Sequence, residues 1–539
     1  MNGNALRRSP ALSLLAAAAA LVLIGGLGTL GGDGGDTTPA APAGEAARAP
    51  VERTALVCPE PSAVEEATTD YTSYSPAGDG PAGDSLPGTA ALFPIARYTP
   101  DTGSGDGDGK DEDGKDDEEG EDAKDGEETE ETAEEPAPEP VVESDEPGTP
   151  VAATVKAGKA TALAGAAEHR VAPGWTVQQS SVVDTESTRG LLGTACQSPA
   201  TDFWFAGAAT VDTRHDYIHL TNPEDTGTVV DIELYGPEGP VETSIAEDGI
   251  SLPGRSSVAV RLSTLTGEQH AGLAVHVTAR TGRIGAQIET VDEQLGADWL
   301  PAVSGGTEGR VVLPGIPPDA KTVRLVAFTP GDADLNLSVQ LIGPSGTFTP
   351  AGNESIFLRS RLLEAVELAD ITQGEPGSLL LTPEGSVTGP VVASLRVTRG
   401  DGSKQEMAFV TGTEPVEERA SVSGNLLKGT ELSLAAPGET VEARVTWSAG
   451  SGGGSAVTEE ITVPAGTTVA VTPELPEESE GRYAATVERI SGGELFASRT
   501  LTMERDKIPM FTVQTLPDDR SRVTVPGTGE DIGILLPDD

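Results

Sequence analysis

The stretch IHLTNPEDTGTVVDIELYGPEG, residues 218–239, contains two apolar runs of strand character separated by a turn rich in Pro, Asp and Gly. A similar stretch, LVAFTPGDADLNLSVQLIGPSG, occupies residues 325–346. The shared positions lie 107 residues apart: Pro223, Asp225, Gly236, Pro237 and Gly239 recur as Pro330, Asp332, Gly343, Pro344 and Gly346. Turn and core residues recur in every copy of a structural unit, whereas catalytic residues as a rule do not. The repetition therefore predicts a building unit and not a catalytic device.

The repeat continues into the following strands with an offset of 106 residues. Its members are Ile250, Leu252, Val260, Leu262 and Leu265, which match Ile356, Leu358, Val366, Leu368 and Ile371. Residues 354–371, ESIFLRSRLLEAVELADI, resemble a helix in isolation. The repeat aligns them with GISLPGRSSVAVRLSTL, so the register predicts a strand, a turn and a second strand.

A third copy follows, because SLPGRSSVAV at 251–260 matches TVPAGTTVAV at 462–471. An all-β chain of three tandem β-sandwich modules of the immunoglobulin-like kind is predicted, at residues 171–305, 306–412 and 413–539.

The N-terminal part is predicted to lie outside these modules. Residues 1–43 contain Arg7 and Arg8 before an apolar run from 11 to 30, which is typical of a signal peptide or a membrane anchor. Both alternatives stay open, and both place the rest of the chain outside the cytoplasm. Residues 44–98 are interpreted as a linker with short strands that join the first module, and residues 99–170 as a disordered acidic and Ala-rich linker.

The charge of the chain excludes several partners. The 539 residues carry a formal net charge of −51, and residues 101–150 alone contain 23 Asp and Glu against three Lys. Nucleic-acid affinity depends mainly on Lys and Arg, so nucleic-acid binding is excluded. Docking on anionic lipid is disfavoured for the same reason, which leaves the N-terminal segment as the only predicted membrane contact.

The chain has two cysteines, Cys58 and Cys196. In an exported chain such a pair predicts a disulfide, and two independent thiols are the alternative. The disulfide would tie the N-terminal strand RTALVC to the first module.

The segment DFWFAG groups three aromatic residues, Phe203, Trp204 and Phe205, in a chain that is only 4% aromatic. Such a group serves either as core anchors or as a ligand platform on which a sugar stacks. On a strand, Trp204 faces away from its two neighbours, so its side must be covered. We expect the N-terminal strands held by the disulfide to cover it.

None of the candidate motifs for catalysis or metal binding lies in the structural setting that its chemistry needs. GLGTLG at 26–31 lies within the export segment with no strand before it. His215 and His219 sit on a predicted strand, which separates them by roughly 13 Å. An EF-hand calcium loop needs an oxygen ligand at its fifth position, and in the acidic segment this position is Lys110 or Lys115. The sequence therefore predicts no catalytic residue, no metal site and no cofactor, and hence no enzyme.

Several long motifs resemble an uncharacterised family of exported actinobacterial proteins of the streptomycete type, which carries a domain-of-unknown-function label. These motifs include VERTALVCPEP, APGWTVQQ, TDFWFAGA, LPGIPPDAKTVRLVAFTPG and IPMFTVQTLPDDR. The resemblance covers residues 51–98 and 171–523 and implies export and envelope association, with no functional residues to transfer.

The sequence as a whole predicts a non-enzymatic protein of the cell envelope with a structural or binding role. A glycan- or peptide-binding accessory protein of the cell wall is the alternative, and an envelope hydrolase is a third. The expected partner is a cell-wall glycan or an envelope protein.

Overall fold

The computed structural model describes residues 47–62, 67–78, 86–99, 138–185, 188–245, 248–306 and 309–525. Residues 49–523 form one compact unit, and the described residues beyond them belong to a separate unit. β1 (Ala47–Pro50) and β37 (Arg522–Val525) pair as a two-stranded sheet. The predicted export segment lies outside the described residues. Among the described residues no helix is long and apolar enough to cross a membrane.

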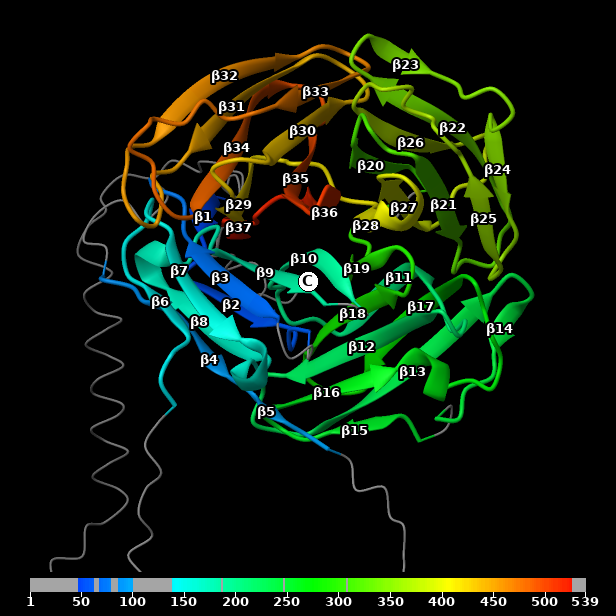
Figure 1. The fold of residues 1–539 in the computed structure, drawn as a ribbon, viewed down its shortest axis with the longest axis horizontal. Helices are drawn as coiled ribbons and strands as arrows, with labels where there is room; N and C mark the ends of the chain where they lie inside the picture. The colour runs from blue at the N-terminus through cyan, green and yellow to red at the C-terminus, as the bar shows by residue number, and fades with distance from the viewer. Residues whose placement is uncertain are drawn as a thin grey trace, which may run out of the picture. The chain divides into compact units, whose positions relative to one another are not determined.

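The regular secondary structure of the described residues is almost entirely β-strand, which confirms the predicted all-β class, and all strands but β1 and β37 form four β-sandwiches (Figure 1). The first contains β2 (Arg53–Cys58), β3 (Thr68–Tyr74), β4 (Ala90–Pro94), β6 (Val142–Ser144), β7 (Val151–Lys156), β8 (Leu163–Glu168), β9 (Thr176–Asp184) and β10 (Arg189–Ala195). The second contains β11 (Asp202–Ala208), β12 (Arg214–Asn222), β13 (Thr228–Gly236), β14 (Gly239–Val241), β15 (Ile250–Leu252), β16 (Ser256–Arg261), β17 (Leu273–Ala279), β18 (Gly285–Asp292) and β19 (Gly296–Leu300), to which β5 (Ala96–Arg97) is added.

The third sandwich contains β20 (Val311–Ile316), β21 (Thr322–Phe328), β22 (Leu335–Gly343), β23 (Gly346–Phe348), β24 (Ser355–Leu358), β25 (Leu363–Glu367), β26 (Gly377–Pro383), β27 (Val392–Arg399) and β28 (Glu406–Thr411). The fourth contains β29 (Arg419–Asn425), β30 (Thr430–Ala436), β31 (Val441–Trp447), β32 (Val457–Val463), β33 (Thr467–Val471), β34 (Tyr483–Gly492), β35 (Phe496–Arg505) and β36 (Ile508–Leu516). Short 3-10 turns lie at η1 (Ala157–Lys159), η2 (His169–Val171), η3 (Leu262–Thr264) and η4 (Gly402–Lys404).

All four sandwiches repeat one strand order. The sheet that holds the first strand, here called the leading sheet, runs β2-β8-β4-β6, β11-β17-β13-β14, β20-β26-β22-β23 and β29-β34-β31-β32. The other sheet, here called the trailing sheet, runs β10-β9-β3-β7, β19-β18-β12-β16, β28-β27-β21-β25 and β36-β35-β30-β33. The two-layer packing is shared with immunoglobulin domains, while this order differs from their ABED and CFG sheets.

Each sandwich encloses its own apolar core, because alternate residues of both sheets point inward. Ile218 and Val275 lie in the second core, Leu325 and Leu381 in the third, and Leu434 in the fourth, all fully buried. The smaller core of the first sandwich includes Leu56, Tyr71, Leu92, Leu163 and Val177.

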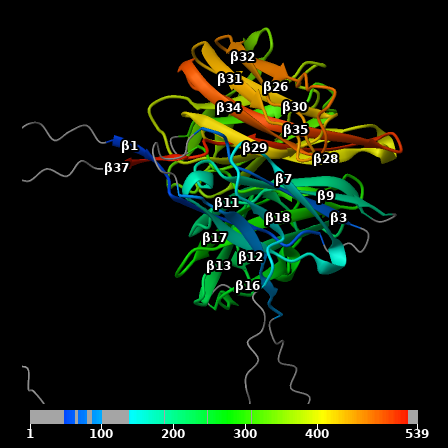
Figure 2. The same ribbon diagram turned by 90° about the vertical axis from the view of Figure 1, so that its left-hand side faces the viewer.

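The four sandwiches contact one another in a closed cycle. Their last strands, β10, β19, β28 and β36, meet in the interior, each contacting the next and β36 contacting β10 (Figure 1). The leading sheets of the second, third and fourth sandwiches also pack on the trailing sheet of the next sandwich in the cycle, as β11 does on β27 and β20 on β35. The contact of β29 with β9 and β3, which joins the fourth sandwich to the first, can be followed in Figure 2.

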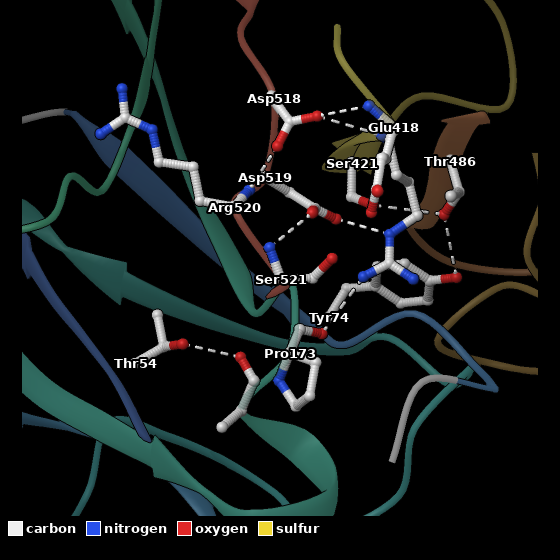
Figure 3. A network of polar contacts seen from close by, with 12 residues as sticks. Thr54, Tyr74, Pro173, Glu418, Ser421, Thr486, Asp518, Asp519, Arg520 and Ser521 are labelled. Atoms are coloured by element: carbon white, nitrogen blue, oxygen red, sulfur yellow. Dashed lines mark hydrogen bonds and ion pairs between the residues drawn. The ribbon is translucent and has the colours of Figure 1, made fainter. Parts of the chain in front are cut away.

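The segment after β36 also ties the fourth sandwich to the first (Figure 3). The Asp518 carboxylate accepts the backbone N–H groups of Glu418 and Arg419 at 2.8 and 3.2 Å. Asp519 forms a buried ion pair with the Arg419 guanidinium at 2.6 Å. Val51 donates its backbone N–H to the Ser521 carbonyl at 2.9 Å, so the first and last parts of the compact unit are joined directly.

The structure corrects the predicted organisation from three modules to four. Residues 44–98 and 99–170 were expected to be linkers, yet they supply β2–β4 and β6–β8 of a complete sandwich. The predicted first module, 171–305, contains two parts, because β9 and β10 belong to the first sandwich and the second begins at β11. The acidic segment separates β5 from β6, and β8 is the Ala-rich LAGAAE, so composition concealed the unit.

Candidate functional site

The predicted aromatic platform is divided by the pleat of β11. Phe203 and Phe205 are buried in the core of the second sandwich, with exposed fractions of 6% and 0%. Trp204 lies on the opposite face of the strand, as the alternation requires. A ligand therefore has no access to two of the three predicted residues, and the platform hypothesis is wrong for Phe203 and Phe205.

Other rings already cover Trp204. Its indole stacks on His276 with centroids 3.9 Å apart and on Phe328 with centroids 5.5 Å apart. Tyr235 completes the group, 4.9 Å from Phe328. Phe328 belongs to the third sandwich, so this sandwich covers Trp204, and the expectation that the N-terminal strands do so is corrected. The apolar face of each β11 aromatic is thus used for packing.

His276 lies between two carboxylates on the same sheet face. Its Nδ1 is 2.9 Å from Glu233 and its Nε2 is 2.7 Å from Asp202. Only the imidazolium can donate to both. The hydrogen bond from His276 lowers the pKa of the Glu233 carboxyl, and Glu233 also accepts the Tyr235 hydroxyl at 3.1 Å.

This group does not have the geometry of a hydrolytic triad. The hydroxyl of Thr278 lies 3.2 Å from His276 Nε2 and Glu233 lies at Nδ1, which is the arrangement of nucleophile, base and orienting carboxylate. Asp202 is closer to the same Nε2 than Thr278 is. Because the Asp202 carboxylate lies closer to this nitrogen, it competes with the Thr278 hydroxyl for it. The group is better described as a set of polar contacts that holds His276 in place against Trp204.

Metal-binding geometry is lacking in the part of the chain that the structure describes. No group of three or more His, Cys, Asp or Glu side chains there could hold a metal ion. His219 Nε2 lies 3.2 Å from the Glu289 carboxylate within the trailing sheet of the second sandwich, so it is a buried structural residue.

The two cysteines form the disulfide Cys58–Cys196, with an S–S distance of 2.02 Å. Cys58 ends β2 and Cys196 follows β10, so the bond joins the leading and trailing sheets of the first sandwich. It closes a sequence separation of 138 residues, which includes the acidic segment.

A cleft of about 1310 Å³ opens between the second and third sandwiches. One wall is formed by the end of β13, the hairpin to β14 and the segment 264–272 of the second sandwich. The other is formed by Arg324, Leu363, Glu364 and Ala365 of the third. Its lining contains no Phe, Tyr or Trp. Leu363, Glu364 and Ala365 belong to β25, which is an edge strand of its sheet.

The cleft carries an excess of negative charge. Its lining includes Glu238, Glu242, Glu268 and Glu364 against a single arginine, Arg324. Glu364 is paired with Arg359 at 3.3 Å and Arg324 with Glu367 at 2.6 Å. Glu238 and Glu242 are exposed and form no ion pair with any described residue. The site therefore suits a partner that brings cationic groups.

Sequence reasoning missed this cleft for a physical reason. The repeat register correctly predicts β25 as a strand, in alignment with β16. Nothing in one sequence shows that the edge of β25 faces a wall from the preceding sandwich. The fourfold strand order and the pairing of sandwiches are needed to see it.

Comparison with known proteins gives a family but no function. A family described as "Family of unknown function (DUF5719)" matches residues 151–474, from β7 of the first sandwich to beyond β33 of the fourth. No curated protein and no solved structure matches the chain. The matched segment covers more than half of the sequence, so the chain belongs to the DUF5719 family, whose function is unknown.

Proposed function

We propose that the protein is a non-enzymatic component of the actinobacterial cell envelope, exported by its N-terminal segment, with a structural and binding role. The observation that carries the proposal is the acidic cleft between the second and third sandwiches, which combines an exposed strand edge with unpaired carboxylates. The disulfide supports an oxidising location outside the cytoplasm.

The same cleft favours a peptide over a glycan as partner. Sugar platforms use the faces of Phe, Tyr and Trp rings, and the described cleft lining contains none of these residues. The indole of Trp204, the best candidate for stacking, is already stacked on His276 and Phe328. The hydrolase alternative is disfavoured because the hydroxyl of Thr278 faces an imidazole nitrogen that Asp202 also engages.

The test is retention of the full chain on isolated actinobacterial envelopes. Envelope material is prepared in three forms: untreated, stripped of wall glycan, and digested with protease. We expect retention on the untreated and glycan-stripped forms and its loss after protease digestion. Retention that depends on glycan would overturn the peptide assignment, and no retention on any form would overturn the binding role.

The non-enzymatic part of the proposal has its own test. The full chain is incubated with purified peptidoglycan and with simple ester and amide substrates, and released products are measured by mass spectrometry. We expect no release above buffer. Product formation that Asp202→Asn or His276→Gln abolishes would show that the polar group on β17 is catalytic.

A further inference from the structure

The fourth strand of the trailing sheet occupies the equivalent position in every sandwich. This strand is β7, β16, β25 or β33 in the first, second, third and fourth sandwich. In the second sandwich the outer edge of this strand is occupied by another part of the chain. β5 lies parallel to β16, with Ala96 opposite Ser256 and Arg97 opposite Ser257. The backbone N–H of Tyr98 donates to the Ser257 carbonyl at 2.7 Å. The fold therefore accepts an added parallel strand at this position.

The equivalent edge in the third sandwich belongs to β25. The offset of 106 residues that relates the two copies places Leu363 at the position of Ser257. Ser257 offers its carbonyl to the added strand, and Leu363 occupies the corresponding position on β25. β25 is the last strand of its sheet, with no strand beyond it among the described residues.

The hydrogen bonds at both ends of β25 show which of its groups face outward. Leu368 donates its N–H to the Val323 carbonyl at 2.8 Å, and Arg361 donates its N–H to the Thr329 carbonyl at 3.0 Å. In an antiparallel ladder, bonded and non-bonded pairs alternate along the strand. The odd-numbered residues of β21 are therefore the ones that bond with β25.

The register then assigns each residue of β25. Val366 and Glu364 lie opposite odd-numbered residues of β21, so their N–H and C=O groups face that strand. Leu363 and Ala365 lie opposite even-numbered residues, so their N–H and C=O groups point away from β21. Leu363 is only 2% exposed because it packs against the second sandwich, whereas Ala365 is exposed in the cleft. No described residue forms a backbone hydrogen bond with these outward groups. Unpaired edge groups of this kind are the template for strand addition.

The edges of the other two sandwiches differ. The start of β33 is covered by the third sandwich, where Thr347 donates its hydroxyl to the Gly466 carbonyl at 2.9 Å. The edge of β7 faces a smaller cleft of about 950 Å³, whose wall includes Leu426 and Leu427 and the ion pair of Arg482 with Asp70. Among the described residues, β25 is the one strand of the four whose open edge faces carboxylates without an ion-pair partner, those of Glu238 and Glu242.

We propose that the edge of β25 binds an extended, lysine- or arginine-rich segment of an envelope protein as an added parallel strand. Main-chain hydrogen bonds to the exposed Ala365 would hold it, and its basic side chains would meet Glu238 and Glu242 across the cleft. This partner assignment rests on the proposed binding role.

The test measures binding of a fluorescein-labelled decapeptide of alternating lysine and valine to the full chain by fluorescence anisotropy. Ala365→Pro removes one outward N–H and leaves the ladder to β21 intact, because proline is tolerated at an edge where its nitrogen faces solvent. We expect this variant to raise the Kd about tenfold, through loss of a main-chain bond and the bulk of the ring.

The matched control is Ala152→Pro on β7. Ala157 donates its N–H to the Ala67 carbonyl at 3.0 Å, so the same alternation turns the N–H of Ala152 outward. This variant makes the same chemical change at the equivalent edge of another sandwich, and we expect it to leave the Kd unchanged. The double variant Glu238→Gln/Glu242→Gln is expected to raise the Kd several-fold and to weaken its salt dependence.

A peptide with the same side chains and N-methyl groups at alternate backbone nitrogens tests strand addition without altering the protein. We expect the N-methylated peptide to bind at least about tenfold more weakly to the natural chain. Equal affinity for both peptides, equal affinity of the natural chain and Ala365→Pro, or no binding of the unmodified peptide would each overturn the inference. The comparison of the two peptides on the natural chain tests strand addition even if Ala365→Pro does not fold.

The envelope retention assay separates this inference from the proposed function. If Ala365→Pro and the natural chain are retained equally on envelopes, the binding role stands and strand addition at β25 is overturned. If neither is retained while the peptide arms give the expected result, strand addition stands and the envelope role is overturned.

Discussion

The carboxylate Oδ1 of Asp298 accepts the backbone N–H of Gly193 at 3.2 Å, which joins the last strand of the second sandwich to the last strand of the first. Thr512 of the fourth sandwich and the backbone of Phe409 of the third also interact favourably with the same carboxyl group. Burial nevertheless raises the pKa of Asp298 well above its usual value. One side chain therefore interacts with all four sandwiches where their last strands meet.

Close packing around this contact predicts the effect of a single methyl group. A Cβ on Gly193 would lie 2.5 Å from Thr512 Cγ2, which is a branched side chain with little freedom to move. We expect Gly193→Ala to lower the free energy of unfolding by about 1–3 kcal/mol. Gly438→Ala is the control, because nothing lies within 4 Å of its Cβ position. Urea unfolding would contradict the account if both variants had the same midpoint.

A second interior contact predicts a pH dependence of stability. Glu406 of the third sandwich is paired with Arg189 of the first at 2.5 Å, and its side chain is 1% exposed. Burial raises the pKa of Glu406 from 4.5 to about 7, and the hydrogen bond from Arg189 only partly offsets this. Between these pH values the native state holds a proton that the unfolded state has released. The stability from this group is therefore complete below pH 4.5 and is lost as the pH rises through about 7.

The variant Glu406→Gln removes this titration. The unfolding free energy of the natural chain minus that of the variant should fall by up to about 3 kcal/mol between pH 4.5 and 7 and then level off. Chemical denaturation of both proteins at half-unit pH steps measures this difference. A difference that stays constant or increases with pH would contradict the assigned proton.

The disulfide predicts a large loss of stability on reduction. Cys58–Cys196 closes a long loop through the acidic segment, so it removes much conformational freedom from the unfolded chain. We expect the double variant Cys58→Ser/Cys196→Ser to lose about 2–5 kcal/mol of unfolding free energy. Dithiothreitol should destabilise the natural chain to the same extent and leave the variant unchanged. An equal loss of unfolding free energy in both proteins on adding dithiothreitol would show that the destabilisation does not come from this disulfide.

The assignment of Trp204 as a packing residue also has a direct test. Because its indole contacts Phe328 of the third sandwich, Trp204→Ala should destabilise the protein by about 3–5 kcal/mol. The variant should keep its affinity for envelope material at temperatures where it is folded. Loss of retention without loss of thermal stability would restore the ligand-platform hypothesis.

The limits of sequence-based prediction can be seen in the first sandwich. Pro147 and Gly148 match Pro253 and Gly254 at the offset of 106, so a signal of the fourth copy was present. It was concealed because the acidic insertion shifts the strands before it, so that no single offset relates this copy to the others. Strands made of alanine also lack the β-branched residues that identify a strand in composition.

The other three sandwiches were predictable because turn residues repeat at nearly constant spacing, as Pro223, Pro330 and Pro437 do after β12, β21 and β30. The cleft was not predictable for a different reason. The edge of β25 has no added strand among the described residues, whereas β5, from a distant part of the chain, covers the equivalent edge of β16. Such a difference between copies arises from tertiary contacts, which local patterns do not encode.

The most direct measurement is hydrogen exchange of the full chain, followed by mass spectrometry with residue-level fragmentation, with and without the lysine–valine peptide. The outward N–H group of the exposed residue Ala365 has no partner among the described residues, so it should exchange rapidly in the free protein. The account predicts that the peptide slows exchange at this amide and leaves the amide of Ala152 unchanged. Unchanged exchange at Ala365, or protection confined to other strands, would contradict the assignment of this edge as the binding site.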